Sequence, residues 1–190
     1  MNAPLIAPNV PRVMRLRVDD FLVLNDAGAF QDYAKVELIE GEIFSMNAQY
    51  SRHALTKSRL AVLLSLALRD KTMAIEAIIE VAVRLSDDSM PEPDIVLTSY
   101  KGDGPVPLDT LALVVEVADT TLDFDLGRKR ALYARHGVPE YWVVDVEGRT
   151  VHQHWSPDGD SYAQSRTLTF GEPLVAATID GLSVPTATLG

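Results

Sequence analysis

The feature that most constrains the fold is an apolar strand that contains one acid. Residues 111–117 read Leu-Ala-Leu-Val-Val-Glu-Val, which is apolar except for Glu116. Near-continuous apolar runs of this length are typical of strands in the centre of a sheet that is covered on both faces. A carboxylate in such a strand is unfavourable unless it is paired with a cation or bound to a metal. The run therefore predicts a covered sheet with a polar site in it.

Hydrophobic periodicity predicts the elements around this strand. Apolar residues at helical spacing follow Ser51, a suitable N-cap, and Gly137 supplies the residue that ends many helices. We expect an α/β fold in which a central mixed sheet is flanked by helices, with an N-terminal strand pair and a C-terminal hairpin. The expected elements, in chain order, are a helix over 18–29, two strands over 36–44 that turn at Glu40-Gly41, a helix over 51–70, strands over 74–85, 95–97 and 111–117, a helix over 123–136, a strand over 141–145, and a hairpin of 151–155 with 162–168.

Length and composition fit one domain. With 190 residues, we expect an N-terminal arm over 1–17 and a single domain over 18–190. The chain has no cysteine, which excludes disulfides and thiolate metal sites and fits a cytoplasmic location. The start of the chain lacks a signal-peptide pattern, and the apolar stretch 60–68 is too short to span a membrane. We therefore expect a soluble protein with no membrane partner.

The charge of the chain is acidic overall but unevenly distributed. A formal net charge of −10 argues against general coating of nucleic acid, which depends on Lys and Arg. Two interpretations of the basic clusters remain open, namely solvated helix faces or a local basic lip beside an acidic metal site. The clustered residues are Arg52, Lys57, Arg59, Arg69 and Lys71, and then Arg128, Lys129, Arg130 and Arg135.

Asp94 and Glu116 are the acids that interrupt the apolar strands. Asp94 follows Pro91-Glu92-Pro93 and opens the strand 95–97. If the two strands are neighbours, both carboxylates converge on one hard cation, which is how Mg²⁺ (or Mn²⁺) is held by carboxylates, waters and a phosphate. A metal in that place lowers the pKa of bound water and neutralises charge on a phosphate during in-line attack. The pair predicts a metal site.

The helix after Glu116 carries a second pattern. Asp125, Lys129 and Tyr133 are spaced i, i+4, i+8 and share one helical face. In one interpretation, Lys129 pairs with Asp125 and stabilises the helix by about 0.2–0.5 kcal/mol. In the other, this face returns over the end of the Glu116 strand, where the ammonium orients the attacking water and stabilises charge on the phosphate.

These residues resemble the bacterial Uma-two family of endonucleases, which belongs to the PD-(D/E)xK superfamily. The resemblance spans about residues 15–155. It rests on Pro93-Asp94, Val115-Glu116-Val117, the Asp125, Lys129 and Tyr133 spacing, and the run Gly-Val-Pro-Glu-Tyr-Trp-Val-Val-Asp over 137–145. The segment Glu-Leu-Ile-Glu-Gly-Glu over 37–42 and His53 also look like that family.

The resemblance implies a restriction-endonuclease-like fold and a metal-dependent phosphodiesterase that acts on DNA. It assigns the metal-binding acids to Asp94 and Glu116. The superfamily places its Lys two residues after the acid, where this chain has Ala118, so the Lys role passes to Lys129. By analogy with such nucleases, the resemblance also implies a homodimer.

Three further polar residues have two interpretations each. Glu37 is either an extra acid of the site or an exposed residue of a polar hairpin. Glu80 is either a ligand or a solvent-facing edge residue, and we expect solvent. His53 either contacts phosphate or is exposed in the first turn of its helix.

The other candidates are expected to be structural. His152 and His154 alternate along a strand without a third ligand, so surface positions are expected rather than a zinc site. We expect Tyr141 and Trp142 in the core, and Asp145 as the cap of a turn.

Two functions of different classes follow. The first is a Mg²⁺-dependent DNA endonuclease that uses Asp94, Glu116 and Lys129. The second is a catalytically inactive protein that keeps the nuclease fold and acts as a binding or interaction module, which the net charge and Ala118 favour. The sequence contains no Gly-rich phosphate loop, no Gly-x-Ser-x-Gly elbow and no cysteine nucleophile.

Overall fold

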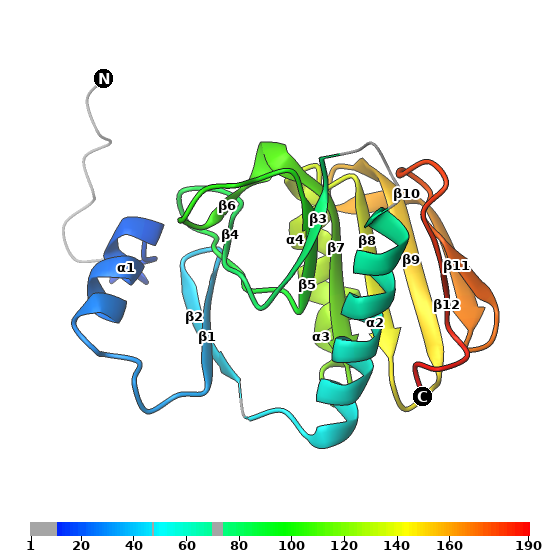
Figure 1. Cartoon of the computed structure of the whole chain (residues 1–190). Helices are drawn as coiled ribbons and strands as arrows, with labels where there is room; N and C mark the ends of the chain where they lie inside the picture. Colours follow the sequence, from blue (N-terminus) through cyan, green and yellow to red (C-terminus); the bar gives the residue numbers. More distant parts are fainter. Residues whose placement is uncertain (1–10, 47, 70–73) are drawn as a thin grey trace.

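The centre of the molecule is a mixed six-stranded sheet with the strand order β10-β9-β8-β7-β5-β3 (Figure 1). The computed structural model describes residues 11–46, 48–69 and 74–190. Strands β7 and β8 run parallel, and the other neighbours run antiparallel. The expected mixed sheet is therefore confirmed. Its strands are β3 (Glu76–Ile79), β5 (Ile95–Thr98), β7 (Leu111–Ala118), β8 (Glu140–Asp145), β9 (Thr150–Asp158) and β10 (Ser161–Thr169).

Helices cover both faces of this sheet, which explains the apolar run in β7. Helix α2 (Ser51–Arg69) packs Leu60, Leu64 and Leu68 against one face. The other face is covered by the helical run after β7, which comprises α3 (Leu122–Phe124), the π-helical turn η2 (Asp125–Lys129) and α4 (Arg130–Arg135). Because side chains alternate along a strand, β7 must be apolar on both sides. None of the helices in the described ranges has the length and apolarity of a membrane span.

The N-terminal strand pair is present as expected. Strands β1 (Lys35–Ile39) and β2 (Glu42–Met46) are antiparallel, and Glu40 and Gly41 turn between them with φ of +52° and +76°. A Cβ at Gly41 would lie 2.5 Å from the Cβ of Arg15, so glycine is required there. Helix α1 (Val18–Asp26) is shorter than the expected 18–29.

The extent of the N-terminal arm stays a prediction. Residues 1–10 lie outside the described residues. Residues 11–17 form no helix or strand, and all of them are exposed except Leu16, which is partly buried. The amide of Leu16 donates to the carbonyl of Gly41, which ties this segment to the β1–β2 turn.

The single strand expected over 74–85 is wrong. The chain leaves β3 at Glu80, which has a left-handed backbone with φ of +49°. It then forms β4 (Val83–Arg84), which pairs in parallel with β6 (Val106–Pro107) outside the main sheet. The apolar pattern continues through the break, so periodicity alone does not reveal it. After β6, a short 3₁₀ turn, η1 (Leu108–Thr110), leads into β7.

A small sheet near the C-terminus is held to the main sheet by apolar packing and by one buried acid. Strands β11 (Pro173–Val175) and β12 (Ser183–Pro185) were not expected from the sequence. Glu140 is completely buried, and its carboxylate accepts hydrogen bonds from the amides of Ala177 and Thr178, the Thr178 hydroxyl and the Trp142 indole at 2.6–3.0 Å. One side chain thus fixes the segment that leads from β11 to β12.

We expect Glu140→Gln to destabilise the fold. The amide would turn a donor toward donors, and each buried group left unsatisfied costs about 1–3 kcal/mol. Urea denaturation should show a loss of about 2–4 kcal/mol. The matched control is Glu147→Gln, because Glu147 is exposed. Equal stability of the two variants would contradict the role of Glu140.

Candidate active site

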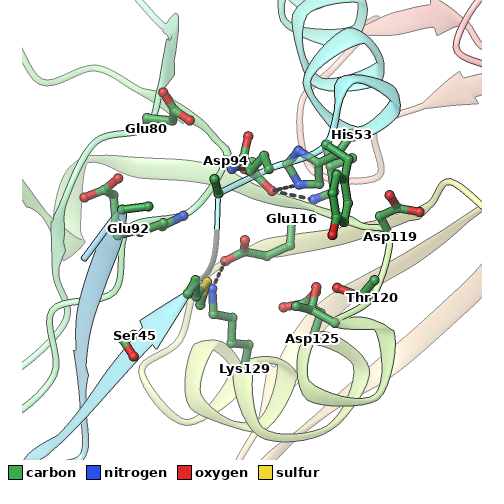
Figure 2. Close-up of a pocket in the computed structure, with 18 residues that line it drawn as sticks. Ser45, His53, Glu80, Glu92, Asp94, Glu116, Asp119, Thr120, Asp125 and Lys129 are labelled. Atoms are coloured by element: carbon green, nitrogen blue, oxygen red, sulfur yellow. Dashed lines mark hydrogen bonds and ion pairs between the residues drawn. The ribbon is translucent and has the colours of Figure 1, made fainter. Parts of the chain in front are cut away.

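A pocket of about 640 Å³ lies where the end of β2, the start of α2 and the loop after β7 meet (Figure 2). Asp94, Glu116, Asp125 and Lys129 all line it. In Figure 2, Glu80 and Glu92 stand on one side and Asp119 and Thr120 on the other, with Glu116 between them. The polar residues predicted from separate segments are therefore brought to one place.

Asp94 is held at the start of β5 by donors from two other elements. Ile95 lies opposite Val115 in the antiparallel β5–β7 pair, which places Asp94 next to Glu116. Its Oδ2 accepts the amide of Val117 at 2.8 Å and lies 3.3 Å from Nε2 of His53. Burial opposes ionisation, but the bonds from His53 and Val117 and the charge of Lys35 hold the pKa of Asp94 well below its usual range. Asp94 is therefore a carboxylate at neutral pH.

His53 is not an exposed residue of the first helical turn, although it lines the pocket. It is 8% exposed, and its Nε2 faces Asp94. The interpretation of His53 as an exposed residue is wrong, because α2 turns this side chain toward the start of β5. A contact of His53 with phosphate stays a prediction.

Glu116 is the acid from the centre of the sheet, and its surroundings favour its protonated form. Its Oε1 accepts hydrogen bonds from Nζ of Lys129 at 2.9 Å and from the hydroxyl of Tyr133 at 3.0 Å. Burial raises the pKa of Glu116 to about 8; Lys129 opposes this increase, while the charges of Asp125, Asp94 and Glu37 add to it. The negative charge around Glu116 therefore exceeds the positive charge that Lys129 supplies.

Lys129 is a buried cation shared by two acids. It is 1% exposed, and its Nζ lies 2.9 Å from Oε1 of Glu116 and 3.1 Å from Oε1 of Glu37. Burial opposes the charge, but Glu116 and Glu37 keep the pKa of Lys129 above its ordinary value. The interpretation of Glu37 as an exposed hairpin residue is wrong, because Glu37 is fully buried and points to Lys129.

Lys129 pairs with Glu116 and Glu37 rather than with Asp125. Asp125 instead accepts the hydroxyl of Thr121 at 2.6 Å, so the interpretation of an i, i+4 ion pair is wrong. Asp125 and Lys129 lie at the two ends of the π-helical turn η2. Short π-helical turns recur at functional sites. Burial raises the pKa of Asp125 to about 6, with Lys129 and the Thr121 hydroxyl opposing it.

Lys57 is a second buried ammonium that the sequence pattern grouped only with basic helix faces. It is 5% exposed and contacts Oδ1 of Asp94 at 3.5 Å and Oε1 of Glu80 at 2.5 Å. Its spacing of four residues from His53 was the available signal, because i and i+4 share a helix face. Glu80 is exposed, as expected, although its side chain also lines the pocket.

The buried charges of the site leave room for a divalent cation. Four buried carboxyl groups face two buried ammonium groups, so full ionisation leaves a formal charge of −2 (four negative minus two positive). The carboxyl groups are Glu37, Asp94, Glu116 and Asp125, and the ammonium groups are Lys57 and Lys129. Within the described ranges, no hydrogen bond to Oε2 of Glu116 is found, so this oxygen is available as a ligand.

The donor set is that of a two-carboxylate site. Among the described residues, no three or more His, Asp or Glu side chains are grouped to hold a metal ion. Asp94 and Glu116 with waters are nonetheless the oxygen ligands that Mg²⁺ commonly takes, because it retains much of its hydration. The metal-binding roles of these two acids and the catalytic role of Lys129 remain predictions.

Basic residues near the pocket are mostly paired with acids. Arg52 pairs with Asp119 at 2.5 Å, and Arg128 pairs with Glu40 and Glu42 at 3.1 and 2.7 Å. Arg52, Arg69 and Arg135 are exposed, as expected of a solvated helix face, whereas Lys57 and Lys129 are buried. The basic lip stays a prediction. The first predicted cluster also included Lys71, which lies outside the described residues. The second included Arg135, which pairs with Glu40 and Asp160.

The remaining structural expectations are mostly met. Tyr141 and Trp142 are fully buried, and Oδ1 of Asp145 accepts the amide of Gly148 at 2.8 Å, which caps the turn after β8. His152 is partly exposed, but the expected surface position of His154 is wrong. His154 is 7% exposed and packs against the rings of Tyr141 and Tyr162.

Comparison with known proteins points in one direction. The model of the Uma2 family, described as "Putative restriction endonuclease", matches residues 18–187. No curated protein matches the chain. One matching solved structure is described as "a putative nuclease belonging to DUF820 from Anabaena variabilis ATCC 29413", with 16% identity and a TM-score of 0.69, and the match covers 92% of this chain and 97% of that chain. The likeness confirms the expected fold.

We expect Glu116→Gln to stabilise the metal-free protein increasingly as the pH rises from about 4.5 to about 8. The pKa of Glu116 rises to about 8 on folding, so between these values the folded state binds more protons than the unfolded state. Stability of the wild type therefore falls with pH in this window, and glutamine removes the fall. Thermal unfolding in the presence of EDTA should show a gain of at least about 1 kcal/mol at pH 8. A gain that is independent of pH would contradict the burial of an uncompensated acid.

Proposed function

The chain belongs to the Uma2 family of restriction-endonuclease-like proteins, and we propose that it is a metal-dependent nuclease that hydrolyses phosphodiester bonds in DNA. The observation that carries the proposal is the excess of buried carboxylates beside a buried lysine in one pocket. Asp94 and Glu116 come from neighbouring strands, and Lys129 lies 2.9 Å from Glu116. Strongly shifted pKa values in a pocket, together with specific charge partners, are characteristic of functional sites.

Asp94 and Glu116 are the residues that would hold the metal. A bound Mg²⁺ would supply an activated water and neutralise charge on the phosphate. Asp94 is ionised over the neutral pH range and kept in place by Val117 and His53. Glu116 is oriented by Tyr133, which donates to Oε1 and leaves Oε2 toward the pocket. The protein thus presents one ready carboxylate and one that becomes ionised when a cation arrives.

Lys129 would stabilise negative charge on the phosphate and help to orient the attacking water. The superfamily position of the lysine is Ala118 here, which is buried at the end of β7, the strand that carries Glu116. Lys129 reaches the same acid from the helical side instead, and Glu37 holds the ammonium from the other side at 3.1 Å. A buried cation fixed by two acids needs little reorganisation during the reaction.

A second function, a binding module without catalysis, is favoured by two observations. Ala118 removes the usual lysine, and the pocket is lined by more acids than cations. In that case, the two acids would bind no metal and the chain would act through a partner, with a second copy of itself as the partner implied by analogy with such nucleases.

Cleavage should depend on both the metal and the acids. We expect the wild type to cut DNA with Mg²⁺ or Mn²⁺ and to be inactive in EDTA. Glu116→Ala should abolish cleavage, and Lys129→Met should reduce kcat by about 100- to 1,000-fold, as loss of one preorganised donor does. The assay is gel analysis of labelled DNA, with Glu147→Ala as the exposed control. Full activity of Glu116→Ala with a normal circular-dichroism spectrum would exclude the assignment.

Metal binding separates the two functions. Calorimetric titration with Mn²⁺ should show binding in the micromolar range that is lost in Asp94→Asn. Binding should also release protons at pH 7, because Glu116 must ionise to act as a ligand, and repeating the titration in buffers of different ionisation heat measures this release. Absence of Mn²⁺ binding by the folded wild type would favour the binding module.

A further inference from the structure

On the basis of the proposed nuclease function, we propose that the DNA segment that enters this pocket is unpaired, either a single strand or an opened end, and that Tyr50 stacks on one of its bases. Three features carry this inference, namely the depth of the acids, the balance of charge around them and an exposed aromatic ring at the pocket. The first two favour insertion of a single strand over docking of a duplex.

The groups that would meet the scissile phosphate lie at the floor of the pocket. Asp94 and Glu116 are each 3% exposed, and Lys129 is 1% exposed. Backbone phosphates of a duplex lie on the outside of a wide, stiff cylinder and meet protein groups that stand at the surface. A single strand is flexible and narrow, so one of its phosphates reaches a recessed group without deformation of a helix.

The size and walls of the pocket suit a short strand. A volume of about 640 Å³ lies within the range of about 300–1,000 Å³ that is typical of small-molecule sites. Its walls come from separate elements, namely Ser45 and Met46 at the end of β2, Gln49 and Tyr50 before α2, and Thr120 after β7. Figure 2 shows Ser45 and Thr120 on different sides of Glu116. The acids thus lie in a recess between walls from separate elements.

The charges at the pocket do not form a track for a duplex. Duplex affinity comes largely from Lys and Arg contacts to many phosphates. Among the described residues that line the pocket, the lysines are Lys35 and Lys129, and both pair with Glu37, at 3.6 and 3.1 Å. Six carboxyl groups line the same pocket, namely Glu80, Glu92, Asp94, Glu116, Asp119 and Asp125. Such a lining admits few phosphates, and those only with the aid of a cation.

The ring of Tyr50 offers a binding contact for an unpaired base, which the charges of the pocket do not. It lines the pocket, yet 73% of it is exposed, so its ring is available to a base. Unpaired nucleotides bind to exposed aromatic rings by stacking, which is independent of sequence. Tyr33 provides a matched control, because it is 56% exposed but does not line the pocket.

The test uses the full chain and makes two comparisons. It compares single-stranded with duplex DNA, and the wild type with variants of Tyr50. We expect oligo(dT) to be cleaved with Mg²⁺ at a higher kcat/KM than a blunt oligo(dA)·oligo(dT) duplex of the same length. Tyr50→Ala should raise KM on oligo(dT) by about 5- to 150-fold with little change in kcat, as loss of one stacked base predicts. Tyr50→Phe and Tyr33→Ala should resemble the wild type. Fluorescence anisotropy of labelled oligo(dT) with Ca²⁺ in place of Mg²⁺ should show the same order of affinities.

The outcomes separate this inference from the function on which it rests. Preferential cleavage of the duplex, or equal behaviour of Tyr50→Ala and Tyr33→Ala, would overturn the inference and leave the nuclease intact. If neither form of DNA is cleaved or bound with Mg²⁺ or Mn²⁺, the nuclease function itself is overturned.

Discussion

The contact of Lys129 with Glu37 and Glu116 is the interaction on which the site depends. It joins the N-terminal strand pair, the central strand β7 and the helical run that follows β7, which are far apart in the sequence. Glu116 is tolerated in the middle of a sheet because this ammonium lies beside it, and the ammonium is tolerated because two acids share it. Removal of Lys129 would leave Glu37 and Glu116 without the buried cation that they share. The three elements therefore hold one another in the arrangement that forms the pocket.

The balance of charge in this cluster is unfavourable for the protein without a bound cation. Four buried acids with two buried lysines keep the metal-free protein under electrostatic strain, and the raised pKa values of Glu116 and Asp125 express that strain. A sequence optimised for stability alone would replace one acid with an amide. Retention of all four is understandable if a cation completes the cluster, because binding energy then offsets the unfavourable burial.

The sequence predicted those parts of the fold that depend on periodicity and on single conspicuous residues. The apolar run with Glu116, the Pro93-Asp94 start of β5 and Gly137 each indicated their element correctly, because each expresses a local requirement. The break at Glu80 was missed because no sequence pattern reveals a left-handed backbone conformation at a residue other than glycine. The burial of His53 and Lys57 was missed, and that of Glu37 was left open, for another reason. It depends on how the strand pair and α2 pack against β5 and β7, and a sequence does not record distances between elements.

The β1–β2 hairpin has a mode of attachment with its own consequence. Its turn is held to the helical run by Arg128 and Arg135 through Glu40 and Glu42, and these charged groups are all partly exposed. Attachment by solvent-accessible charge weakens as ionic strength rises, whereas apolar packing does not. The same hairpin carries Glu37, which is held by the buried contact with Lys129 and by the packing of Leu38 and Ile39 on either side of the core. High ionic strength therefore loosens the turn of the hairpin and leaves its buried end, with Glu37, in place.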